Sequence, residues 1–384
     1  MRRKKGMRSR HIFIPIVLLA LVGDYWRRLP GRCRLPKPFS NVKGKAITTM
    51  GLLLIGNLAI WALAIVTFHH FALLLGTATL AYTFGLRHAL DADHISAIDN
   101  VTRKLMQDGQ RPALVGFFFS LGHSTIVILL SVAIALTASG IQSRFPDMQR
   151  VGGLIGTSVS ALFLLVIAGI NLLVLRGVVQ AFSRVKRGEP YDDQDLDAQL
   201  NQLGIMGRIF RPVLRLVDRS WKMYGVGFLF GLGFDTATEV GLLGISATSA
   251  TLGLPIWSIL VFPLLFTAGM CLVDTADGIL MLGAYGWAFV HPVRKLYYNM
   301  TITTVSVVIA VVVGGIEVLG IIGDQFNLHG FFWNGISSLS DHFGVIGVII
   351  VSIFIASWAA SALAYRLLGF QKLELAPEVA ARSM

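Results

Sequence analysis

The sequence has little charge and little cysteine. Only 14% of its 384 residues are charged, and cysteine occurs twice. Cys33 and Cys271 are too few for a disulfide framework or a thiolate metal cluster, so this sequence is not that of a disulfide-rich secreted protein. The chain also lacks the GxxxxGK[ST] loop that cradles phosphates, which argues against ATP hydrolysis by this polypeptide.

Long apolar runs are abundant instead. Apolar residues make up 54% of the chain, and the mean hydropathy is +0.69. A helix of about 20 apolar residues crosses the roughly 30 Å of hydrocarbon in a bilayer, and runs of this length without alternation are helices rather than barrel strands. We therefore predict an all-α polytopic membrane protein with eight transmembrane helices. The eight runs are residues 47–68, 71–99, 113–138, 151–175, 224–245, 254–281, 300–322 and 343–367.

The basic residues are distributed unevenly between the loops. Of the 33 Lys and Arg residues, 13 lie in residues 1–46 and 9 in the loop 176–222, whereas the loops on the other side hold only Arg144 and Arg150. Basic residues accumulate on the cytoplasmic side of membrane proteins. We therefore expect both termini in the cytosol, and the net charge of +12 indicates topology and contact with anionic membrane lipids rather than nucleic acid.

The chain divides into three parts. Residues 1–46 form a basic cytoplasmic arm whose apolar stretch, 12–23, is too short to span a membrane. We interpret that stretch as an interfacial segment, with an uncleaved or mis-assigned leader as the alternative. Residues 47–367 form the eight-span domain, which includes the cytoplasmic loop 176–222, and residues 368–384 form a cytoplasmic tail.

An internal repeat relates spans two to four to spans five to seven. Three pairs of segments match in order at an offset of 146 or 147 residues. Because each copy has three spans, the two copies must have opposite orientations in the membrane. Such inverted repeats are typical of secondary transporters, whose substrate sites lie near the midplane. The pairs are FGLRHALDAD and FGLGFDTATE, starting at 84 and 230; FSLGHS and FTAGMC, starting at 119 and 266; and GIN and GIE, starting at 169 and 315.

Seven acidic residues lie inside the predicted spans. Seven charges facing lipid would cost roughly 17 to 25 kcal/mol, so we expect these side chains to face the bundle interior. Arg87 is the one basic side chain at that depth, and several carboxylates therefore need protons or a bound cation. Cation transport follows more naturally than anion transport. The seven are Asp91, Asp93, Asp235, Glu239, Asp274, Asp277 and Glu317.

The stretch RHALDADHI, residues 87–95, combines histidine with aspartate. On an ideal helix His88, Asp91 and His94 share one face, while Asp93 points elsewhere. Either the helix unwinds after His88 so that Asp93 joins a metal ion, or Asp93 belongs to a partner helix and Arg87. Mixed imidazole and carboxylate ligands suit Ni²⁺, Co²⁺ or Zn²⁺, whereas Mg²⁺ and Ca²⁺ prefer oxygen alone and Cu(I) prefers sulfur.

At these residues the sequence resembles the nickel/cobalt transporter family, whose hallmark HX4DH is formed here by His88, Asp93 and His94. Further blocks of that family match LGHSTIV, LGFDTATE and GMCLVDTADG, starting at 121, 232 and 269, and the resemblance covers the whole eight-span domain. It implies that four residues bind metal, namely His88, Asp91, Asp93 and His94. It also implies a secondary metal path or supporting role for six others: His123, Asp235, Thr236, Glu239, Asp274 and Asp277.

Three further residues are weaker candidates for the site. Arg87 is expected to tune a neighbouring carboxylate, because direct contact with a dication would be repulsive. Asn171 and Glu317 occupy matching positions in the repeat.

We therefore predict a secondary transporter that moves Ni²⁺ and/or Co²⁺ across the bacterial cytoplasmic membrane by alternating access. The metal is the transported substrate, no cofactor is expected, and neutral imidazoles are required, so acid should weaken binding. Uptake is the expected direction, and efflux or Zn²⁺ transport is the alternative. A more remote alternative, an intramembrane metalloenzyme, would need a paired ligand and base such as HEXXH, which the sequence lacks.

Overall fold

A computed structural model describes residues 37–136, 145–186, 217–233, 236–288 and 292–367, and all its regular structure in these ranges is helical. Three predictions concern residues outside them. These are the interfacial segment in residues 1–46, the C-terminal tail 368–384, and the role of Asp235.

Among the described residues, five helices are long and apolar enough to cross a membrane, and a sixth candidate is a bent pair. The pair consists of α14 (Phe331–Asp341) and α15 (Phe343–Leu367), which meet at an angle of 72°. The chain is therefore a multi-pass helical membrane protein. The five are α2 (Lys37–Phe68), α5 (Val115–Leu136), α6 (Phe145–Lys186), α12 (Val261–Ala288) with the short α11 (Ile256–Ile259) before it, and α13 (Pro292–Gln325).

Two of the predicted spans are not continuous helices, and the first one unwinds after His88, which was one of the two predicted alternatives. The run 71–99 forms α3 (Ala72–His88) and α4 (Ala92–Gln107), and the run 224–245 forms α9 (Met223–Phe230) and α10 (Ala237–Thr251). The second half of each begins after a residue in extended conformation, Asp91 in the first and Thr236 in the second, both with ψ near 145°. Both runs that carry the polar motifs are therefore interrupted in the middle.

At each break a side chain accepts a hydrogen bond from a nearby backbone N–H. Asp93 Oδ1 accepts from the His94 N–H at 2.9 Å, and Thr236 accepts from the Glu239 N–H as the N-cap of α10. Short polar side chains that bond locally in this way favour caps and turns over continuous helix. Polar residues inside an apolar run therefore mark where each helix stops.

Each break is also contacted closely by a glycine of another helix. A side chain at Gly347 of α15 would overlap the carbonyl oxygen of Leu90, and one at Gly156 of α6 would overlap the backbone of Gly233. Only glycine lets the two backbones approach this closely. The unwound segments are thus held by neighbouring helices.

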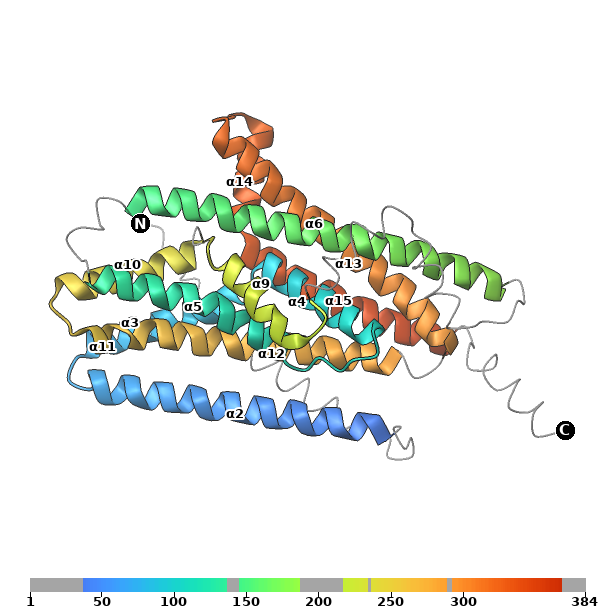
Figure 1. The fold of residues 1–384 in the computed structure, drawn as a ribbon, viewed down its shortest axis with the longest axis horizontal. Coiled ribbons are helices and arrows are strands. Elements are labelled where there is room, and N and C mark those ends of the chain that lie inside the picture. The colour runs from blue at the N-terminus through green and yellow to red at the C-terminus, as the bar shows by residue number, and fades with distance from the viewer. Residues whose placement is uncertain (1–36, 137–144, 187–216, 234–235, 289–291, 368–384) are drawn as a thin grey trace, which may run out of the picture.

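The helices pack in related pairs. α3 runs along α12, α9 along α5, and the two long helices α6 and α13 along each other, whereas α4 lies among α12, α13 and α15. Figure 1 shows α2 on one edge of the bundle and α14 projecting from the opposite edge. Lys104, near the end of α4, donates to the carbonyl of Val217 at 2.8 Å, just before the 3-10 helix η1 (Ser220–Lys222) that leads into α9. We call this end of the bundle, where α4 ends and α9 begins, the basic end.

The polar motifs lie where two apolar cores meet. One core contains Phe119 of α5 with residues of α4, α6, α13 and α15, and the other contains Phe266 of α12 with residues of α2 and α3. His94 packs edge-on against Phe119, and His88 lies 5.5 Å from Phe266 between ring centroids. Of the seven intramembrane acids, six lie in the described ranges: five are buried and Asp93 is half-buried, as the cost of exposing them to lipid requires.

Candidate metal centre

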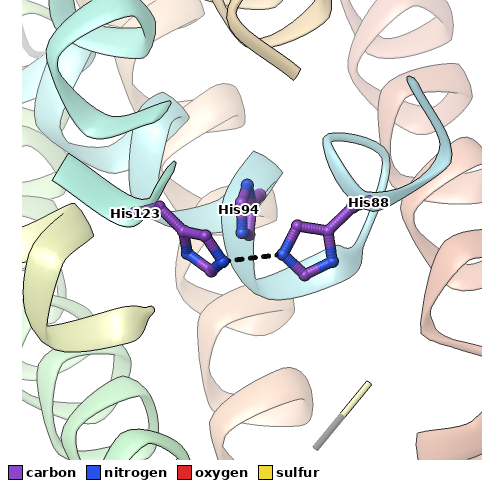
Figure 2. Close-up of side chains that lie close together, drawn as sticks. All are labelled: His88, His94 and His123. Atoms are coloured by element: carbon purple, nitrogen blue, oxygen red, sulfur yellow. Dashed lines mark hydrogen bonds between the residues drawn. The ribbon is translucent and has the colours of Figure 1, made fainter. Parts of the chain in front are cut away.

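Three histidines from three helices converge in the interior. His88 is the last residue of α3, His94 lies in the first turn of α4, and His123 lies in the middle of α5. One ring nitrogen from each lies within 4.8 Å of the others, and all three side chains are buried. Figure 2 shows the rings of His88 and His123 facing each other, with His94 behind and between them.

The spacing of the ring nitrogens fits a transition-metal ion. The Nε2 atoms of His88 and His123 are 3.0 Å apart. Imidazole nitrogens bind such ions at about 2.0 to 2.1 Å, so two ligands at a right angle are about 3 Å apart and two opposite ligands at most about 4.2 Å apart. His88 and His123 therefore stand at the distance of adjacent ligands, and a small closure would bring His94 into range.

The helix break brings His88 and His94 together. On a continuous helix, residues six positions apart are separated by about 9 Å along the axis. Their ring centroids are only 4.6 Å apart here, because the chain turns at residues 89–91 before α4 begins. The break thus turns a linear motif into a compact pair of ligands.

Glu239 supplies a carboxylate to the cluster. Its Oε1 lies 2.8 Å from His123 Nε2 and 3.8 Å from His88 Nε2. The hydroxyl of Thr236 donates to its Oε2 at 2.8 Å and so orients the carboxylate from the N-terminus of α10. An imidazole nitrogen pair with an anionic oxygen alongside is a suitable ligand set for a divalent transition metal.

Two further carboxylates contact the Nδ1 atoms of two of the imidazoles. Asp91 is 3.1 Å from His88 Nδ1, and Asp274 is 3.3 Å from His94 Nδ1 and accepts a hydrogen bond from Ser120 at 2.6 Å. A carboxylate that takes the N–H of one ring nitrogen leaves the other nitrogen as a metal ligand and fixes the ring. Consistent with this, His94 Nε2 is buried without a hydrogen-bond partner among the described residues.

Sequence reasoning missed two supporting hydroxyls. The Thr238 hydroxyl lies 3.2 Å from His88 Nδ1, and Ser120 holds Asp274. Both residues lie inside segments that the repeat had already marked, FGLGFDTATE and FSLGHS, so their positions in those segments were the available signal.

Asp93 takes a different position from its neighbours. The helix does unwind after His88, as one of the two alternatives required, yet Asp93 Oδ1 accepts the backbone N–H of His94 at 2.9 Å. Its half-buried side chain also lines the cavity described below, as does that of the exposed Arg87.

Three predicted residues lie away from the imidazoles. Asn171 donates to Asn100 on α4, and Glu317 accepts from Ser160 on α6. Asp277 lies one helical turn beyond Asp274, buried, and its carboxylate has no hydrogen-bond partner among the described residues.

A cavity of about 1000 Å³ leads to the cluster. It reaches from the imidazoles to residues at the start of α6, the end of α13 and α14, such as Arg150, Asp324 and Trp333. These segments lie away from the basic end. Three members of the cluster line its wall, namely His88, His123 and Glu239.

Comparisons with known proteins agree with this geometry. The profile of the family described as high-affinity nickel-transport protein (NicO) matches residues 74–364. A high-affinity nickel transport protein of Cupriavidus necator is 54% identical over 87% of this chain and 95% of its own length. The hydrogenase nickel incorporation protein HupN of Bradyrhizobium diazoefficiens is 48% identical over 82% of this chain and 83% of its own.

A cobalt transport protein, NhlF of Rhodococcus rhodochrous, is 41% identical over 76% of this chain and 82% of its own length. No solved structure matches the chain.

Proposed function

The chain belongs to the family of high-affinity nickel-transport proteins, a family of transporters rather than enzymes, and on that premise we propose that it takes up Ni²⁺ and/or Co²⁺ across the cytoplasmic membrane. The observation that carries the proposal is the buried cluster of His88, His94 and His123 at the inner end of a cavity. The metal ion is the transported substrate, not a cofactor.

The proposed site has two layers. His88, His94, His123 and Glu239 hold the ion, while Asp91 and Asp274 orient the first two imidazoles through their Nδ1 atoms. Such orienting carboxylates keep the ligand nitrogens unprotonated and directed at the metal.

The order of contact follows from access. His88, His123 and Glu239 line the cavity together with Asp91 and Asp93, whereas His94 is fully buried behind them. An ion from the cavity would therefore meet the carboxylates and two imidazoles first, losing its water, and would reach His94 last. Asp274 and Asp277 then continue the path along α12 toward the basic end.

We further propose eight spans arranged as an inverted repeat. The five long helices, the bent pair α14 and α15, and the two broken runs make eight crossings if each pair counts once. The packing of α3 on α12 resembles that of α9 on α5, which are the corresponding helices of the other copy. Broken helices at matching positions of two copies are typical of transporter binding sites.

Uptake is supported by charge and by the position of the cavity. With the basic loops in the cytosol, both termini are cytosolic and the cavity opens to the outside. The name of the HupN relative, a nickel incorporation protein for hydrogenase, also fits delivery of metal into the cell.

Liposomes containing the purified protein test this function directly. We expect accumulation of Ni²⁺ or Co²⁺ that is abolished by His88→Ala and retained by His69→Ala, which removes an exposed histidine at the end of α2. Uptake by His88→Ala liposomes at the wild-type rate would contradict the site. Cells that become more tolerant of nickel on expression would instead indicate efflux, and preferential accumulation of Zn²⁺ would change the substrate.

A further inference from the structure

The internal repeat extends to a set of polar residues that metal binding does not use. The segment TSVS at 157–160 of α6 corresponds to TTVS at 303–306 of α13, at the offset of 146 that also relates Asn171 to Glu317. The repeat therefore relates three polar residues of α6 and α13 to three others at the corresponding positions of the same two helices. The inner triad is Thr303, Ser306 and Asn171, and the outer triad is Thr157, Ser160 and Glu317.

The inner triad binds helix α4. Ser306 donates to Asp99 at 2.8 Å, Asn171 donates to Asn100 at 2.6 Å, and Thr303 accepts from the Arg103 guanidinium at 3.0 Å. All six side chains are buried. Three polar residues of α4, at positions 99, 100 and 103, are thus each held by a residue of α6 or α13.

Because Arg103 is buried, separating α4 from the inner triad would leave its guanidinium without a hydrogen-bond partner on α13. Its side chain is 1% exposed, and within the described part of the chain its hydrogen bonds run to Thr303 and to Asn100, at 3.1 Å. A buried guanidinium without its partners would lose several favourable interactions at once. The contact between α4 and the inner triad therefore holds α4 firmly against α6 and α13.

The outer triad faces the cavity instead. Thr157, Ser160 and Glu317 all line it, and Ser160 donates to Glu317 at 2.7 Å, directly between α6 and α13. The helix that corresponds to α4 in the other copy is α10. The two halves thus differ in one respect: the inner triad binds α4, and the outer triad lines the cavity.

We propose that the two triads are alternating docking faces, and that Asn171 and Ser306 are positioning residues that hold α4, and with it His94, in this state. In the opposite state α4 leaves the inner triad while α10 docks on the outer one. The residues of α10 that correspond to Asn100 and Arg103 are Ser246 and Ser249, both buried. Their shorter, uncharged side chains make the outer contact weaker, which explains why the cavity is open on that side.

This inference rests on the proposed transport function, and a labelling experiment separates the two. In the full-length protein with Cys33→Ser and Cys271→Ser, Ser96→Cys introduces a single thiol on α4, at a fully buried position one turn before Asn100. In nanodiscs the rate of its reaction with a charged methanethiosulfonate reports how often α4 moves away. Ser306→Ala and Asn171→Ala should each raise that rate by about 2- to 10-fold, the effect of one lost hydrogen bond on a two-state equilibrium.

The matched control is Ser160→Ala, the same change at the corresponding position of the outer triad, which should not raise the rate. Ser306→Thr retains the hydroxyl and should react as slowly as the parent. Equal rates in the parent, Ser306→Ala and Asn171→Ala would overturn the inference, as would an equal acceleration by Ser160→Ala. Equilibrium dialysis with Ni²⁺ on the same samples tests the proposed function separately, because the labelling rates do not depend on whether nickel binds.

Discussion

The two breaks in the bundle, between α3 and α4 and between α9 and α10, are flanked by similar backbone conformations and by different side chains. Each joins two half-helices and ends in an extended residue. The first is flanked by His88 and His94, whereas the second is followed by the oxygen donors Thr236, Thr238 and Glu239. The comparison teaches that one copy of the motif supplies imidazole nitrogens and the other supplies charge and hydroxyl groups, so the site is chemically asymmetric.

The matching acids Asp93 and Glu239 show this asymmetry at one position. Asp93 bonds to a backbone N–H of its own helix, whereas Glu239, longer by one methylene, reaches His123 on α5. The difference in length decides which of the two acids contacts the imidazole cluster.

The largest expected effect tests the imidazoles of the first break. His94→Ala should weaken Ni²⁺ binding by more than about 100-fold, since loss of a ligand exceeds the 10- to 100-fold typical of supporting residues. Isothermal titration calorimetry measures the change, and His69→Ala, at an exposed position, is the control. Unaltered Ni²⁺ affinity in His94→Ala would mean that His94 is not a metal ligand alongside His88.

Changing the side-chain length of the matching acids Asp93 and Glu239 should have the next largest effect on Ni²⁺ affinity. Glu239→Asp withdraws the carboxylate from His123 and should lower Ni²⁺ affinity by about 10- to 100-fold. Asp93→Glu should change it less than tenfold, because that side chain bonds to its own backbone. Equilibrium dialysis on both variants compares them, and a larger loss in Asp93→Glu would reverse the assignment.

Alanine substitution of the glycine that packs against either break should lower the thermal stability of the protein. Gly347→Ala and Gly156→Ala place a methyl group against the backbone of the first and second break respectively, and overpacking of this kind costs about 1 to 3 kcal/mol. Thermal unfolding of the detergent-solubilised protein should therefore begin several degrees lower. Gly315→Ala on α13 has open space around it and should not lower the midpoint. An unchanged midpoint in Gly347→Ala or Gly156→Ala would mean that this glycine contact does not hold the corresponding break.

The smallest expected effect concerns the hydroxyl that the second break contributes to the first. Thr238→Val removes one polar contact to His88 Nδ1, while Asp91 continues to hold that nitrogen. We expect a loss in Ni²⁺ affinity of about 2- to 10-fold, the effect of one hydrogen bond. Dialysis against Thr238→Ser, which keeps the hydroxyl, separates this loss from a change in packing.

Much of the candidate site was present in the sequence as a set of residues. Glu239 and Asp274 were singled out because charges inside apolar runs are too costly to face lipid. His88 and His94 were singled out from their place beside aspartates in RHALDADHI, and His123 was implied by the family resemblance. Their arrangement was not predictable from spacing. An ideal helix put Asp91 beside the two histidines as a ligand, whereas the break turns Asp91 behind His88 and brings His123 to the front.

The sequence by itself determined the membrane class, the polar runs and the chemistry of the ligands, because hydrophobic length and the cost of buried charge are local properties of the chain. Only the tertiary structure decided which side chains meet and how neighbouring helices hold the two breaks. Those outcomes depend on close helix contacts, such as that of Gly347 with Leu90, between residues more than 200 positions apart. No periodicity within one segment contains that information.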